Sequence, residues 1–230
     1  ADEGLTVVDT LRLAGSSTLT HSSALESGLQ ITAGRVVVEV GSAIDVTGRG
    51  YLGGNRSGFG ETGATLGFQP GAQRGNGGSY GGLGGHYSSS GANQPNPVYG
   101  SLTDPVELGS GGGAWSGDGG NGGGRVLIMA GTIVNDGSII ADGGESSGSA
   151  SGDGSGGSIH LATRVLSGTG SIRADGGGGG TNTGGGGGRI AIRYSEAFTL
   201  PLDNIQVRGG DGFYGDGQEG TVFFDPPVGP

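Results

Sequence analysis

Two aspartates occupy the same place in a repeated motif and have a spacing that would let them act together. Asp142 and Asp175 each follow an Ile-x-Ala sequence and lie 33 residues apart. If equivalent residues of successive repeats stack at about 4.8 Å, the two carboxylates could hold a cation or divide the roles of acid and base. Arg208 follows at the same place and can neutralise Asp175, and aspartate also favours turns. We therefore expect a structural role and keep the pair as weak metal candidates.

Three segments rich in glycine and aspartate raise the question of calcium. They lie at residues 117–122, 152–154 and 209–212 and resemble the repeats of calcium-binding β-rolls. Carboxylate and carbonyl oxygens are suitable ligands for this hard cation. In a β-roll such repeats recur about every nine residues, and here that period fails. We expect no required cofactor, with a calcium ion in the loops as the alternative.

Residues that commonly catalyse reactions are few and scattered. His21, His86 and His160 lie in unrelated contexts, and none has the partners of a Ser-His-Asp triad or a metal site. Cysteine is absent, which removes thiolate catalysis and disulfides. The alternation around His160 puts it on the outward face of a strand. We expect no catalytic residue and no enzyme activity.

Aromatic residues gather in one stretch of the chain. Residues 48–124 hold seven of the thirteen aromatic side chains, set among glycines. Tyrosine and tryptophan combine apolar faces with polar tips, so they can stack on sugar rings or fill a small core. Both interpretations stay open, and four residues are the ligand-binding candidates: Tyr80, Tyr87, Tyr99 and Trp115.

A repeated unit must position these residues. Four similar motifs are centred on Ile44, Ile139, Ile172 and Ile205, and the last three are 33 residues apart, a period typical of a solenoid. Apolar and polar residues alternate in the strands that precede each motif, which indicates one buried face. We predict an all-β fold, a parallel β-helix of about five short coils with the isoleucines in one column. A sandwich of unrelated strands is the alternative. Each coil should also contain a separate middle strand: 36–40, 132–134, 165–166 and 198–200.

Glycine-rich excursions connect the coils. Residues 142–157, 175–188 and 208–220 are similar in length and leave from the same motif, so they should emerge from one edge of the helix and stack. Glycine can adopt the extended threefold polyproline-II form, whose backbone groups stay free to bond neighbouring segments. We predict packed polyglycine-II-like excursions, because ordered glycine needs such partners to offset its entropy. Flexible linkers are the alternative.

The repeat pattern divides the chain into five segments. Residues 1–10 form an N-terminal strand that acts as an intersubunit donor or a cap, and residues 11–47 form the first coils. A glycine- and aromatic-rich insertion spans 48–124 and is expected to fold over the flank of the helix or onto the excursions. Regular repeats of about 33 residues fill 125–224, and 225–230 form a tail.

Composition limits the partners and the location. The 230 residues carry a net charge of −10 and all 11 basic residues are arginine, so a nucleic acid or an anionic membrane finds no basic patch. No apolar run approaches the roughly 18 residues of a membrane span. The start at Ala1, without methionine, is typical of a chain after signal-peptide cleavage. We expect an exported protein of the cell surface or extracellular space.

Several motifs resemble a known class of repeat. The Tyr-Gly-Gly-Leu-Gly-Gly sequence at 80–85, the Leu-Gly-Ser-Gly-Gly-Gly sequence at 108–113 and the Gly-Gly-Arg-Ile sequence at 187–190 are similar to glycine-rich β-helical regions of large bacterial secreted and adhesin-like surface proteins. The resemblance covers about residues 28–224 and implies surface-associated material. It transfers no catalytic residue. This chain is much shorter than those proteins.

Three hypotheses of function follow. The first is an extracellular structural protein that forms a homopolymer, a head-to-tail filament, through its helix ends, because unpaired strand edges invite strand addition. The second is an adhesin or carbohydrate-binding module that binds an extracellular glycan through the aromatic insertion. A β-helical polysaccharide-processing enzyme comes third, since no cluster of charged residues supports it. The assembly candidates are apolar residues near the two ends: Leu5, Val7, Val8, Phe223 and Phe224.

Overall fold

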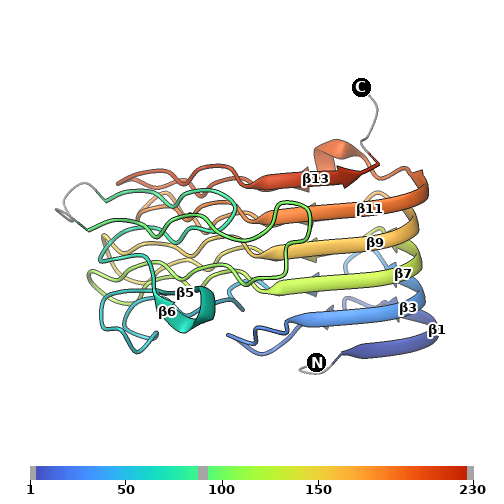
Figure 1. Cartoon of the computed structure of the whole chain (residues 1–230), viewed down its shortest axis with the longest axis horizontal. Helices are drawn as coiled ribbons and strands as arrows, with labels where there is room; N and C mark the ends of the chain where they lie inside the picture. The colour runs from blue at the N-terminus through green and yellow to red at the C-terminus, as the bar shows by residue number, and fades with distance from the viewer. Residues whose placement is uncertain (1–3, 88–92, 227–230) are drawn as a thin grey trace.

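The computed structural model describes residues 4–87 and 93–226, so the outermost parts of the predicted N-terminal strand (1–3) and of the tail (227–230) lie outside the described residues. The fold is all-β and is built on a large parallel sheet (Figure 1). The strands of this sheet lie side by side in chain order: β1 (Leu5–Leu13), β3 (Leu29–Val38), β7 (Arg125–Asn135), β9 (Ser158–Ser167), β11 (Arg189–Phe198) and β13 (Thr221–Asp225).

A second parallel sheet is made of much shorter strands that carry the isoleucine motifs. Its order is β2 (Thr18–Leu19), β4 (Ala43–Asp45), β8 (Ser138–Ile140), β10 (Ser171–Arg173) and β12 (Ile205–Gln206). The long insertion contributes the antiparallel pair β5 (Ala64–Thr65) and β6 (Gln69–Pro70) with the 3-10 turn η1 (Leu66–Phe68) between them. A second 3-10 turn, η3 (Leu202–Asn204), precedes β12.

The register of both sheets aligns equivalent residues of successive repeats, and we call each aligned set a column. Ile44, Ile139, Ile172 and Ile205 pair in turn, so the predicted isoleucine column is confirmed. Leu19 on β2 extends it at the other end. The large sheet has a matching apolar column that runs through all its strands: Leu5, Ile31, Ile128, Leu161, Ile192 and Phe224.

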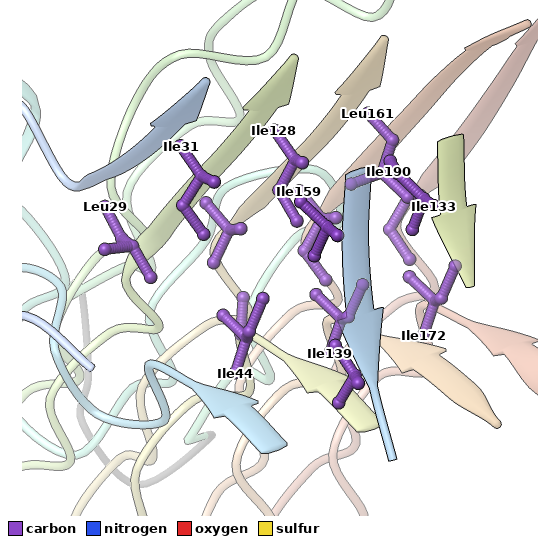
Figure 2. Close-up of a cluster of buried hydrophobic side chains, with 14 of the residues drawn as sticks. Leu29, Ile31, Ile44, Ile128, Ile133, Ile139, Ile159, Leu161, Ile172 and Ile190 are labelled. Carbon is purple, nitrogen blue, oxygen red and sulfur yellow. The ribbon is translucent and has the colours of Figure 1, made fainter. Parts of the chain in front are cut away.

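The hydrophobic core lies between the two sheets. Side chains of the large sheet, such as Ile31, Ile128 and Leu161, point toward Ile139 and Ile172 of the short strands (Figure 2). All five of these side chains are fully buried. Burying one isoleucine contributes about 1.5–3 kcal/mol relative to leaving it exposed. The core therefore consists of apolar columns that continue from repeat to repeat.

The predicted middle strands do not stand apart from the strands before them. The stretch around Val36 continues β3, and the stretch at Thr132 continues β7. The prediction of three separate strands in each coil was wrong here, because strand pairing continues through the position where a break was expected. Opposite Gly34 of β3, the partner strand β1 has a bulge, in which the register shifts between Val7 and Thr10.

That bulge also changes the interpretation of the N-terminus. Residues 1–10 were expected to form a strand apart from the first coils, but Asp9 and Thr10 lie inside β1, which continues to Leu13. Leu5 and Val7 pair in parallel with Ile31 and Ala33. The predicted boundary at residue 10 therefore falls within a single strand, whose outer side is the edge of the sheet.

Candidate functional site

The aspartates hold the backbone of the following repeat. Asp142 Oδ1 accepts a 2.9 Å hydrogen bond from the backbone N–H of Asp175. In the same way, Asp175 Oδ1 accepts a 2.6 Å hydrogen bond from the backbone N–H of Arg208. The other oxygen of Asp142 forms a 2.8 Å ion pair with Arg173 Nε. Because each carboxylate bonds the next repeat, the column joins successive repeats where their excursions begin.

Burial dominates the electrostatics of Asp142. The pKa of its carboxyl is raised to about 6, chiefly because burial desolvates the charge, while the bond from Asp175 and the charge of Arg173 oppose the shift. A surface cavity of about 610 Å³ lies here, lined by Asp142, Arg173, Thr47, Glu145 and neighbouring glycines. Within residues 4–87 and 93–226, no three or more His, Asp or Glu side chains are grouped to hold a metal ion.

Two of the four aromatic ligand candidates form a packed pair. Tyr80 is fully buried, and its ring lies 4.9 Å from that of Tyr99. The Tyr80 hydroxyl bonds Ser158 Oγ at 2.7 Å and donates to Glu107 Oε2 at 3.1 Å. The Tyr99 hydroxyl donates to the carbonyl of Leu108 at 2.6 Å. Burial raises the pKa of both phenols. Tyr80 therefore has no face open to a ligand.

The other two candidates pack at the far end of the glycine-rich region. Tyr87 is 8% exposed and lies edge-on against Trp115 and Tyr214, with ring centroids 5.3 and 4.9 Å away. Arg74 covers the Trp115 ring, with its guanidinium carbon 3.4 Å from the ring centroid. These contacts join the insertion to the last excursion, because Tyr214 belongs to residues 208–220. A filled miniature core describes this arrangement better than an exposed stacking platform.

Part of the insertion lies along the outer face of the large sheet. Arg189 Nε and Arg193 Nη2 each donate 3.0 Å bonds to backbone carbonyls of the insertion, those of Tyr99 and Thr103. His160 points outward from β9, as its sequence position predicts, but Asp104 of the insertion covers it at 3.0 Å. Burial lowers the pKa of this imidazole, and the charge of Asp104 opposes the shift. This part of the insertion therefore lies over the outer face of the large sheet, one of the two positions that the sequence left open.

An open cavity beside Tyr99 is the feature that sequence reasoning missed. It has a volume of about 580 Å³ and combines proline rings with amide side chains. Its walls are Thr65, Leu66, Pro70, Gly71, Gln73, Gln94, Pro95, Asn96, Pro97 and Tyr99. In the sequence, the alternating amide residues and prolines at 94–97 could have indicated this cavity. Only Tyr99 among the predicted ligand residues reaches this cavity.

The excursions bond to one another through their backbones. Gly177 N–H donates to Gly154 O, Gly185 N–H to Gly177 O and Gly210 N–H to Gly185 O, at 2.8–2.9 Å. These bonds connect all three excursions in one continuous series. At Gly154 and Gly185 an added Cβ would overlap a backbone carbonyl of a neighbouring segment. The segments are therefore packed at a separation that a side chain would prevent.

The assembly candidates lie at the two edges of the large sheet. Half-buried Leu5 and Val7 belong to the first strand, β1, and half-buried Phe223 and Phe224 to the last, β13. Val8, in the bulge, is 97% exposed. Leu5 and Phe224 end the same column on opposite sides of the molecule. At the β13 end the core opens into a cavity of about 240 Å³ that is lined by apolar residues only: Leu202, Ile205, Val222 and Phe224.

Comparison of the chain with protein-family models, with curated proteins and with solved structures finds no match. Among the described residues, no helix is long and apolar enough to cross a membrane.

Proposed function

We propose that the chain is a parallel β-helix whose excursions pack as a polyglycine-II-like layer, and that it serves as an exported structural protein of the cell surface or extracellular matrix. In this function copies assemble head to tail into a filament. The observation that carries the proposal is that Leu5 and Phe224 end one apolar column at opposite edges of the same parallel sheet.

The backbone hydrogen bonds between the excursions support the proposed polyglycine-II-like layer. Segments of extended glycine have no internal hydrogen bonds, so their N–H and C=O groups bond neighbouring segments instead. The series through Gly154, Gly177, Gly185 and Gly210 has this character. A layer of this kind gives rigidity without large side chains, which suits a structural role in a chain with 61 glycines.

Assembly is supported by the open strand edges. A strand at the edge of a sheet offers unpaired N–H and C=O groups to another chain, and natural proteins commonly protect it with charged residues, lysine above all. This chain has no lysine. The edge strand β1 alternates exposed residues with the half-buried Leu5 and Val7. The two edges differ from each other, so contact between them is heterologous and propagates into a fibre unless it closes.

Electron microscopy and sedimentation of the purified chain test the proposal, and we expect filaments. Leu19→Lys and Ile205→Lys put a charge on the core at the two ends and should reduce filament length and sedimentable protein at least tenfold. Met129→Lys is the matched control, because Met129 is exposed on the central strand β7. A monomer at every concentration would refute the proposal, as would equal effects of the three variants in proteins with unchanged circular dichroism.

A second candidate function, binding of a neutral glycan, rests on the cavity at Tyr99. Proline and tyrosine faces with amide groups between them can stack on a sugar ring and bond its hydroxyls. Gln73 and Gln94 are exposed at this cavity. Affinity electrophoresis in gels with dextran should show retardation that Gln73→Ala removes. Equal mobility of the two proteins in dextran and in an empty gel would contradict this candidate.

A further inference from the structure

The two ends of the molecule can be compared residue by residue, since the first part of every strand of the large sheet, before the register shifts in β1 and β11, stays in one register. Thr6, Thr32, Met129, Ala162, Arg193 and Asp225 form the column next to that of Leu5 and Phe224. If another strand were added to the outer edge of β13 in this register, β1 of a second copy could take that position, with Leu5 in the column of Phe224 and Thr6 in the column of Asp225.

We propose that the joint between copies is one further pair of strands in this existing register, an inference that rests on the proposed filament. β1 of one copy adds in parallel to β13 of the preceding copy, with Leu5 beside Phe224 and Thr6 beside Asp225. The partner is a second copy of this chain, and no other ligand is needed.

The second sheet is consistent with the same position of one copy on the next. Leu19 on β2 and Ile205 on β12 end the isoleucine column at its two ends. One movement of a copy along the stack therefore sets Leu5 on Phe224 and Leu19 on Ile205 together. A shift by one residue would turn the apolar side chains of β1 away from the core, because strand side chains alternate between faces.

The apolar surfaces at the two ends also fit each other. The cavity at the β13 end is lined by Leu202, Ile205, Val222 and Phe224. The opposite end presents half-buried apolar residues that pack on one side only: Val7, Leu11 and Leu19 pack on the core, and Leu5 continues the column of Ile31. Joining the ends extends the core without placing a charge in it.

The lengths of the strands restrict the joint. β13 ends at Asp225, whereas β1 continues to Leu13. In this register only Leu5 and Thr6, at the beginning of β1, lie beside β13. The rest of β1 passes the end of β13, so the interface consists of a short strand pair and the apolar ends of the core.

Cysteine pairs test the register directly, because the native chain has no cysteine. Thr6 and Asp225 are exposed and would lie about 4.8 Å apart across the joint, within the Cα separation of about 4.4–6.8 Å that a disulfide spans. The double variant Thr6→Cys/Asp225→Cys should form a series of covalent oligomers on oxidation, which a non-reducing gel resolves. Each single variant should give dimers at most.

The matched control is Thr10→Cys/Asp225→Cys, which puts an exposed cysteine on the same strand beyond the paired part. It should cross-link at least tenfold less. Filaments without preferential cross-linking of Thr6→Cys/Asp225→Cys would overturn the register and leave the filament standing. Monomers without filaments would mean that something other than a second copy covers the edges, which overturns the proposed function as well.

Discussion

Asp142 and Asp175 are 33 residues apart in the chain, yet the carboxylate of the first accepts a 2.9 Å hydrogen bond from the backbone N–H of the second. The next bond of the series runs from the N–H of Gly143 to the carbonyl of Asp175, at 2.8 Å. The aspartate therefore lies where pairing of the isoleucine strands passes into bonding between excursions. A column first considered as a metal or acid–base site acts as a structural junction.

The junction should make stability depend on pH through Asp142. Its folded pKa of about 6 lies above the usual value of 3.8, so the folded state binds the proton more tightly than the unfolded state. This contribution to stability is complete below about pH 4 and is lost as the pH rises through about 6. Its size is about 1.4 kcal/mol for each unit by which the folded pKa exceeds the unfolded pKa.

Asp142→Asn isolates that contribution because the amide oxygen can still accept from Asp175. The free energy of unfolding of the wild type minus that of Asp142→Asn should fall between pH 4 and pH 6 and then level off. Urea unfolding followed by circular dichroism at several pH values measures this difference, in which groups common to both proteins cancel. A difference that is constant or rises over this range would show that burial of Asp142 does not govern its titration.

The glycine layer predicts opposite responses from two glycines of one tract. An added Cβ at Gly176 would overlap the carbonyl of Gly185, whereas at Gly179 its nearest neighbour is Glu145 at ordinary contact distance. Gly176→Ala should therefore destabilise the protein by about 1–3 kcal/mol or more. Gly179→Ala should be neutral or stabilising by up to about 1 kcal/mol, because alanine restricts the unfolded chain. Thermal unfolding of both variants measures the contrast, and equal effects would contradict tight packing at Gly176.

The sequence allowed the columns to be predicted because they repeat. Ile139 and Ile172 could be paired from their spacing alone, since a fixed period and a fixed strand separation leave one stacking arrangement. The aspartate column followed from the same alignment. The position of Asp175 beside Asp142 was thus predictable, whereas the role of its backbone N–H depended on the geometry of the turn.

Contacts outside the period could not be predicted. Tyr80 bonds Ser158, and Tyr87 packs on Tyr214, across long and irregular sequence separations. Nothing in their spacing indicates these pairs, so exposed and buried aromatics looked alike in the sequence. The bulge in β1 was missed for another reason. Asp9 and Thr10 are typical of a break between strands, but pairing with β3 on both sides keeps them within one strand.

Tyr80 gives a prediction that separates a core residue from a ligand-binding one. Tyr80→Phe removes the hydroxyl that bonds Ser158 and Glu107 in a buried site, which should cost about 1–3 kcal/mol. Tyr194→Phe is the matched control, since the Tyr194 hydroxyl makes no hydrogen bond within the described part of the chain and its ring is half-buried. Chemical unfolding compares them, and a Tyr80→Phe protein as stable as Tyr194→Phe would argue against the buried network.

Assembly should depend on salt in the direction set by the charge of the chain. Each copy carries a net charge of −10, so copies that meet end to end repel one another, while the contacts that continue the core across the joint are apolar. Raising the salt from 0.01 M to 0.15 M shortens the Debye length from about 30 Å to about 8 Å and screens the repulsion. The critical concentration for filament formation, measured by sedimentation, should therefore fall at higher salt. Glu219→Gln reduces the negative charge near the β13 end and should shift the low-salt critical concentration the same way. Assembly that weakens as salt rises would instead indicate that attraction between opposite charges holds the joint, against an apolar contact between Leu5 and Phe224.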